Sequence, residues 1–109
     1  MPYYLIQAAY TAESWAAQIK DQPDPRNRLT PLVQKLGGRL ESVYYAFGEY
    51  DIVAVGEFPS NDAAAAFSLA AAAGGAAKAI KTTPLLTIEE GLSAMRKASE
   101  AAGAYRPPR

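Results

Sequence analysis

Four stretches of the chain are apolar or alternate between apolar and polar positions, and each stretch predicts a β-strand. Residues 3–10 are aromatic and aliphatic apart from Gln7. Residues 39–47 and 50–58 flank Gly48, so they are expected to pair as a hairpin. The apolar run 52–55 is typical of a strand covered on both faces. The last strand is expected at residues 76–83, and Pro84 directly after it favours an edge position.

The segments between these strands carry the start and stop signals of helices. Thr11 is expected to cap a first helix, whose buried face is marked by Trp15 and Ile19. Prolines interrupt it near residues 21–25, and the helix is expected to restart after Asp24 and to end at glycines 37 and 38. Pro31 predicts a kink in this helix, or a shorter second piece capped by Thr30. A cap at Ser60 introduces an alanine-rich helix at residues 63–73. A capping box at residues 87–90 opens a final helix that reaches about residue 102.

The element order predicts a ferredoxin-like α+β fold with an additional C-terminal helix. Right-handed crossovers place the first and third strands at the centre of an antiparallel sheet, with the helices on one face. Either alternate set of residues 3–10 that remains on the other face is largely apolar. A monomer does not tolerate an uncovered apolar face of that size, so we expect a homodimer with sheets packed face to face. Residues 1–103 form a single predicted domain, and residues 104–109 a flexible tail.

Composition narrows the classes of function. Lysine and arginine number eleven, as do aspartate and glutamate, so no basic surplus predicts nucleic acid or an anionic membrane as partner. The chain has no cysteine and no histidine. Thiolate and imidazole catalysis and the common zinc sites are therefore excluded, and the scattered carboxylates predict no metal site. We expect a cytoplasmic protein without a cofactor.

Candidate site residues are polar or aromatic groups placed on the predicted strands and the first helix. The ligand-binding candidates are Gln7, Trp15, Tyr45, Tyr50 and Asp51. Asp51 has two interpretations: a carboxylate directed into a pocket, or a structural acceptor for backbone amides in the turn, and we favour the second. The tyrosines can equally line a pocket or pack in a subunit interface. Arginines 26 and 28 can close over a cavity mouth, although a solvated loop is their default interpretation.

Several of these landmarks together resemble the GYD-domain family, a group within the dimeric α+β barrel superfamily. The signature is residues 48–51, Gly-Glu-Tyr-Asp, followed by an apolar strand. The end of the first strand at residues 10–11, Ile-Lys-Asp at 19–21 and Leu-Gly-Gly-Arg-Leu at 36–40 agree as well. The resemblance runs from about Tyr3 to Glu90 and implies the ferredoxin-like fold and a dimer.

Two classes of function follow from these observations. The first is a small hydrophobic or aromatic molecule bound between sheet and helices or at the dimer interface. The second is a non-enzymatic assembly module whose sheet face serves only oligomerisation. Relatives in the superfamily include cofactor-free monooxygenases, isomerases and haem-degrading enzymes, so a cofactor-free monooxygenase or isomerase is a third alternative that rests on fold analogy.

Overall fold

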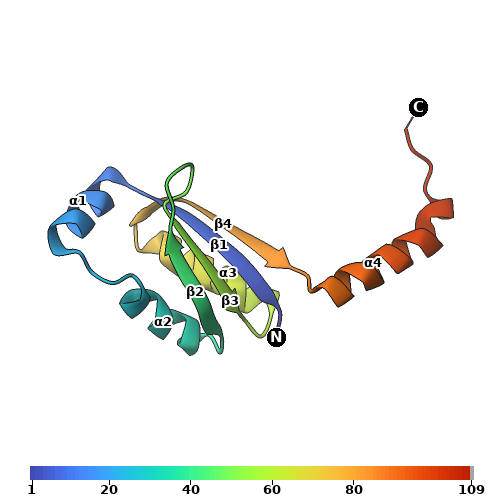
Figure 1. Ribbon diagram of the computed structural model, residues 1–109, viewed down its shortest axis with the longest axis horizontal. Coiled ribbons are helices and arrows are strands. Elements are labelled where there is room, and N and C mark those ends of the chain that lie inside the picture. Colours follow the sequence, from blue (N-terminus) through green and yellow to red (C-terminus); the bar gives the residue numbers. More distant parts are fainter. Residues whose placement is uncertain (109) are drawn as a thin grey trace.

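The computed structural model describes residues 1–108 and shows one antiparallel sheet with two helices packed on one face (Figure 1). Along the chain the elements are β1 (Tyr3–Tyr10), α1 (Ala12–Asp21), α2 (Arg26–Lys35), β2 (Arg39–Tyr45), β3 (Ile52–Glu57), α3 (Asn61–Ala73), β4 (Ala77–Leu85) and α4 (Ile88–Ala101), with a 3-10 turn at Ala102–Ala104.

The sheet has the strand order β2-β3-β1-β4, and all its pairings are antiparallel. The predicted ferredoxin-like fold, with the first and third strands central, is therefore confirmed. β4 lies at an edge as expected, but it continues to Leu85 and so includes Pro84. An edge strand accommodates that proline because one side of its backbone needs no partner.

The core lies between the sheet and helices α2 and α3. Tyr4 and Ile6 of β1 point to this side, opposite Gly56 and Ala54 of β3 in the register. They pack with buried side chains of both helices, and the cluster comprises Tyr4, Ile6, Val33, Ala54, Phe58, Ala64 and Phe67. The even set of β1 thus covers the core, which decides the alternative that the alternating pattern left open.

Most of the predicted helix ends are confirmed in atomic detail. Thr11, Ser60 and Thr87 each accept a backbone N–H of the first turn through their side chains, and the Thr87–Glu90 capping box is complete. Gly37 ends α2 with φ of +79°, a conformation that favours glycine. α2 starts at Arg26 and runs through Pro31 without interruption. α1 differs from expectation because none of its residues is buried and Ile19 is exposed.

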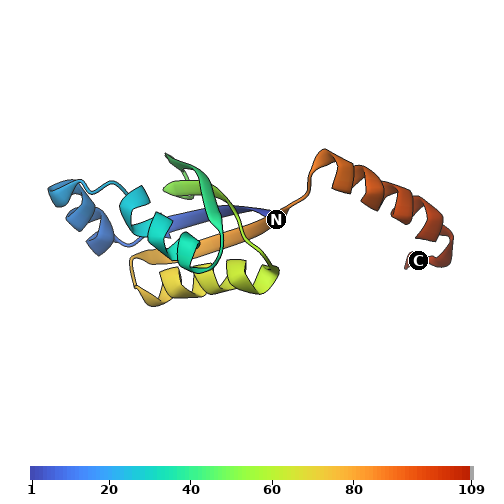
Figure 2. The same cartoon turned by 90° about the horizontal axis from the view of Figure 1, so that it is seen from below.

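Within residues 1–108, no helix covers the opposite face of the sheet. Figure 2 shows α3 beneath the sheet and none of the described helices above it. This open face carries odd residues of β1, among them Tyr3, Leu5 and Gln7, and the side chains in register with them: Val53, Val55 and Glu57 of β3, Ser42 and Tyr44 of β2, and Lys81, Thr83 and Leu85 of β4. Tyr44 retains 68% of its surface exposed. The apolar run of β3 is therefore covered on one face only.

α4 projects beyond the end of the sheet, away from the other helices (Figure 1). Its apolar residues Ile88, Leu92 and Met95 follow helical spacing and form one stripe. Their exposed fractions are 77%, 46% and 63%. α4 is thus a second apolar surface that this chain does not cover by itself.

Candidate functional site

Three hollows lie on the helix-covered side of the sheet, and one of them is an open depression of about 440 Å³ between α3 and β4. The first of the other two, which we call the inner cavity, has a volume of about 300 Å³ and lies between the sheet and helices α2 and α3. Its wall is almost wholly apolar: Ile6, Ala8, Ile52, Ala54 and Ile80 come from the sheet, and Leu29, Leu32, Phe67, Ala70 and Ala71 from the helices.

Small side chains create the inner cavity. Ala8 and Ala54 face it from the central strands, and Ala70, Ala71 and Gly74 face it from α3 and its C-terminus. Larger residues at these positions would fill the space between helix and sheet. Alanine also favours the helix itself, so the composition of α3 serves both helix formation and the cavity.

Tyr10 and Arg28 supply the polar groups of the inner cavity. Arg28 Nη2 donates a hydrogen bond to Tyr10 Oη at 2.7 Å, and the guanidinium carbon lies 5.8 Å from the tyrosine ring centroid. Tyr10 ends β1 on the core side, whereas Arg28 lies in the first turn of α2. Arg28 also donates to Gln18 Oε1 of α1 at 3.4 Å. The pair therefore joins three elements beside an apolar cavity.

The protonation state of Tyr10 follows from its surroundings. Burial raises the pKa of the Tyr10 phenol, and the nearby Arg28 guanidinium opposes that shift only in part. The phenol is therefore neutral at physiological pH. Because Arg28 donates to the phenolic oxygen, the hydroxyl proton of Tyr10 remains available for an acceptor.

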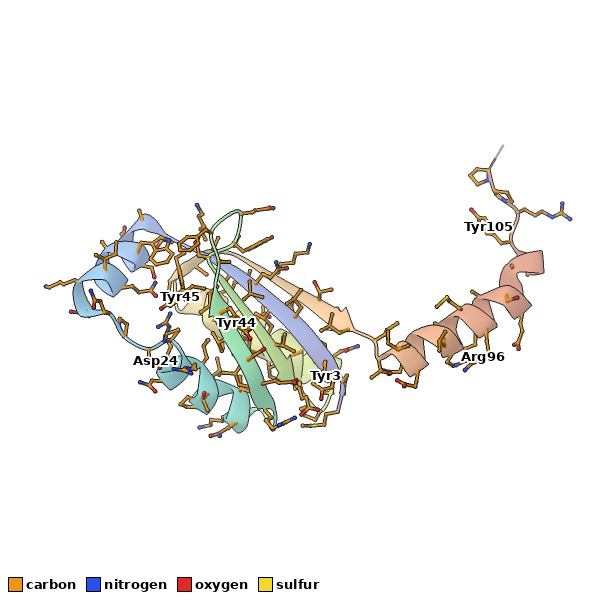
Figure 3. All side chains as sticks on the ribbon, viewed as in Figure 1. Tyr3, Asp24, Tyr44, Tyr45, Arg96 and Tyr105 are labelled. Atoms are coloured by element: carbon orange, nitrogen blue, oxygen red, sulfur yellow. The ribbon has the colours of Figure 1, made fainter. Side chains whose placement is uncertain are left out.

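The second hollow, which we call the outer cleft, is an open depression of about 630 Å³ between α1, the α1–α2 connection and β2. Trp15 and Tyr45 lie side by side in its wall, with ring centroids 6.4 Å apart. Trp15 also meets the Tyr10 ring edge-on at 5.2 Å. Figure 3 shows Tyr45 and Asp24, another residue of this wall, at the same end of the molecule. An aromatic cluster thus links the outer cleft to the Tyr10–Arg28 pair.

Asp51 lies at the place where the ladder between β1 and β3 ends. Its Oδ2 accepts the backbone N–H of Tyr10 at 2.8 Å. Its own N–H donates to the Ala8 carbonyl, and its carbonyl accepts the N–H of Ala46, both at 2.8 Å. The carboxylate therefore extends the sheet by one more bond, at the point where β1 shifts register against β4. This geometry fits the structural interpretation of Asp51.

The five predicted site residues fall into separate places. Trp15 and Tyr45 lie together in the outer cleft, and Asp51 is one bond away from Tyr10. Gln7 is on the open face, between Val53 and Lys81 in the register. Tyr50 is half-buried in the β2–β3 connection. Gln7, Tyr50 and Asp51 line none of the three hollows. The role of all five in ligand binding stays a prediction.

Tyr10 was not among the predicted site residues, although a signal for it exists in the sequence. Like Tyr4 and Ile6, Tyr10 is an even-numbered residue of β1, so its side chain is expected on the same face of the strand as theirs, which is the core side. A phenol at the end of a buried strand needs a polar partner. Arg28 was considered for a cavity mouth, and the structure places it beside the inner cavity. The alanines of the cavity wall could not be recognised as such in the sequence, because an alanine-rich segment indicates a helix and not a cavity.

Within residues 1–108, no three acidic side chains converge in a way that would hold a metal ion. No helix in the same range has the length and apolar character required to cross a bilayer.

Comparison with known proteins gives a single family. The model of the family described as "GYD domain" matches residues 4–95. No curated protein matches the chain. The matched range includes the whole sheet except its first residue, all three hollows and the first half of α4.

Proposed function

The chain belongs to the GYD domain family, and from that premise we propose that it is a homodimer that binds a small, mainly apolar or aromatic molecule. The inner cavity is the observation that carries this proposal. Its volume of about 300 Å³ lies at the lower end of the range for small-molecule sites, roughly 300–1,000 Å³. An apolar wall with a few polar groups at one place is also typical of such sites.

The dimer is supported by the open face, and α4 adds a second apolar surface that a single chain leaves exposed. Leu5, Val53 and Val55 give this face an apolar centre, and Tyr44 adds an exposed aromatic ring beside them. Subunit interfaces are enriched in such groups. A second copy packed on the open face would remove them from water, as the dimeric α+β barrel arrangement requires.

A pure assembly module is the second candidate, and the two uncovered apolar surfaces favour it. The two candidates differ in what they require between the sheet and the helices: assembly alone needs no hollow there, whereas this chain has the inner cavity, whose rim is open to solvent. A catalytic role finds less support. Asp51, the carboxylate candidate for proton abstraction, accepts the N–H of Tyr10 and lines none of the three hollows. We therefore place binding before catalysis.

A cytoplasmic location is part of the same proposal. The sequence has no cysteine, and such a composition suits a compartment in which disulfides are not used for stability.

Filling the inner cavity tests the binding function. The probe is 2-naphthamide, a neutral aromatic amide, and the variant is Ala71→Phe, which places a phenyl ring in the cavity wall. Ala72→Phe is the matched control, because Ala72 is exposed on the same helix and lies outside the cavity wall. We expect saturating probe to raise the melting temperature of wild type and Ala72→Phe, but not of Ala71→Phe.

Equal responses of the two variants would place the probe elsewhere on the protein. Absence of any response of wild type to 2-naphthamide and also to its carboxylate analogue 2-naphthoate, confirmed by calorimetric titration, would contradict the binding function and leave the assembly module.

A further inference from the structure

Within the described residues, Arg28 differs from Arg26 and Arg39, each of which forms an ion pair with a carboxylate. Arg26 pairs with Asp24 at 2.7 Å, and Arg39 pairs with Glu57 at 2.8 Å. Within residues 1–108, Arg28 has no carboxylate within ion-pair distance. Its hydrogen-bond partners are the phenol of Tyr10 and the amide of Gln18, both neutral. A guanidinium has five N–H donors, so most of its capacity is unused.

The acidic groups around the Tyr10–Arg28 pair are engaged elsewhere. The Asp24 carboxylate accepts three bonds from the Arg26 side chain, which hold the pKa of Asp24 at about 2. The Asp51 carboxylate accepts the backbone N–H of Tyr10. The wall of the inner cavity contains no acidic residue. Arg28 is therefore a cation beside an apolar cavity without an anion of its own.

Two hydrogen-bond donors are thus free at one place. Arg28 offers its remaining N–H groups, and Tyr10 offers its hydroxyl proton because its oxygen already accepts from Arg28. Both groups adjoin the apolar wall formed by Leu29, Leu32 and Phe67. An acceptor that approaches this place receives bonds from both donors while the rest of its molecule contacts hydrocarbon.

We infer that the ligand of the inner cavity is a small aromatic or aliphatic carboxylic acid, bound as its anion by Arg28 and the Tyr10 hydroxyl. This inference rests on the binding function proposed above and specifies its ligand class. The planar guanidinium matches the geometry of a carboxylate and holds it through two parallel bonds. The carboxylate also supplies the ion-pair partner that Arg28 lacks within residues 1–108.

The test compares two probes of nearly equal shape, 2-naphthoate and neutral 2-naphthamide, by calorimetric titration at neutral pH. Hydrogen bonds to a charged group are stronger than those to a neutral group, but Arg28 is an exposed residue, so water screens part of the effect. We therefore expect wild type to bind 2-naphthoate about tenfold more tightly than 2-naphthamide. Added salt should reduce this preference.

Variants distinguish a direct contact of the carboxylate with Arg28 from a general attraction by the positive charges of the protein. Arg28→Met should abolish the preference for 2-naphthoate. Its affinity for 2-naphthamide should fall less than its affinity for 2-naphthoate, because a neutral acceptor forms weaker hydrogen bonds with a guanidinium than a carboxylate does. Arg28→Lys should keep part of the preference, because it retains the charge without the planar fork. Lys35→Met is the matched control: it removes one positive charge from an exposed position of the same helix, outside all three hollows, and should keep the preference.

The outcomes distinguish this inference from the proposed function. Equal binding of the two probes to wild type overturns the carboxylate inference and leaves the binding function intact. Binding of neither probe overturns both. A preference that survives in Arg28→Met assigns the anion to another group and overturns the inference. If Arg28→Met fails to fold, the wild-type preference and its expected reduction in Arg28→Lys decide.

Discussion

Tyr10 shows how one residue connects the fold to the candidate site. Its N–H is bound by Asp51, its ring contacts Trp15, and its hydroxyl oxygen accepts from Arg28. The first contact fixes the end of β1, and the other two position the phenol between α1 and α2. A change in the support of the Tyr10 backbone is therefore expected to affect both stability and the geometry beside the inner cavity.

Replacing Asp51 tests that support. Asp51→Ala removes the acceptor for the Tyr10 N–H, which is half shielded from water, and should lower the free energy of unfolding by about 1–3 kcal/mol. Asp51→Asn keeps one acceptor oxygen and should lose less. Thermal or urea unfolding of the two variants beside wild type measures the difference. Glu49→Ala, in the exposed part of the same connection, is the control and should match wild type.

If Asp51→Ala were as stable as wild type while losing ligand, Asp51 would belong to the binding site rather than to the fold.

At the residue scale, the sequence predicts which types of side chain line a hollow better than it predicts where each of them lies in the fold. Trp15 and Tyr45 were predicted as candidates because aromatic side chains line pockets, and they lie together in the outer cleft. Gln7 was chosen because a polar amide in a central strand is unusual, but its odd position on β1 places it on the open face. That choice between faces depends on where the helices pack, which no single strand determines by itself.

At the scale of elements, local chemistry made the helix ends predictable. Thr11, Ser60 and Thr87 satisfy first-turn N–H groups that would otherwise lack partners, and this need is independent of tertiary structure. The buried face of α1 was not predictable in the same way. Trp15 and Ile19 have helical spacing, but α1 extends past the sheet, so only Trp15 finds other side chains to pack on.

Gly38, between α2 and β2, provides a prediction about close packing at this junction. A Cβ on Gly38 would collide with the carbonyl oxygen of Glu57 and lie 3.0 Å from Phe58 and 3.2 Å from Val33. Because one of these neighbours is backbone, the strain cannot be relieved by a rotamer change alone. Gly38→Ala should destabilise the fold by about 1–3 kcal/mol, measured by urea unfolding.

Gly48→Ala is the control for this substitution. Nothing lies within 4 Å of a Cβ at Gly48, so this variant should be as stable as wild type or slightly more stable. Equal stability of Gly38→Ala and Gly48→Ala would mean that the chain between α2 and β2 moves freely to accept a methyl group.

At the scale of the whole molecule, one chain leaves two apolar surfaces uncovered, and they lie on different parts of the structure. The open face belongs to the sheet, whereas the stripe of α4 lies beyond its end. The alternating pattern of the strands predicted the first surface, because both sets of side chains on β1 are largely apolar. It did not predict the projection of α4, which depends on the backbone conformation between the end of β4 and Thr87, the N-cap residue of α4.

The proposed dimer gives the prediction that concerns the whole molecule. Sedimentation at micromolar concentration should give twice the mass of one chain, or a multiple of it. Val53→Asp places a charge at the centre of the open face and should shift the protein to the mass of one chain, because a buried unpaired carboxylate is costly. Tyr44→Asp should weaken the dimer with little effect on the fold, since this side chain is 68% exposed in the single chain.

Ala65→Asp adds the same charge on the exposed side of α3, away from the open face, and should sediment as wild type does. The comparison isolates the sheet surface from the effect of net charge. A wild-type protein that sediments as one chain at every concentration would contradict the dimer. Its open face would then remain in water, and the binding function would have to be carried by the inner cavity of a single subunit.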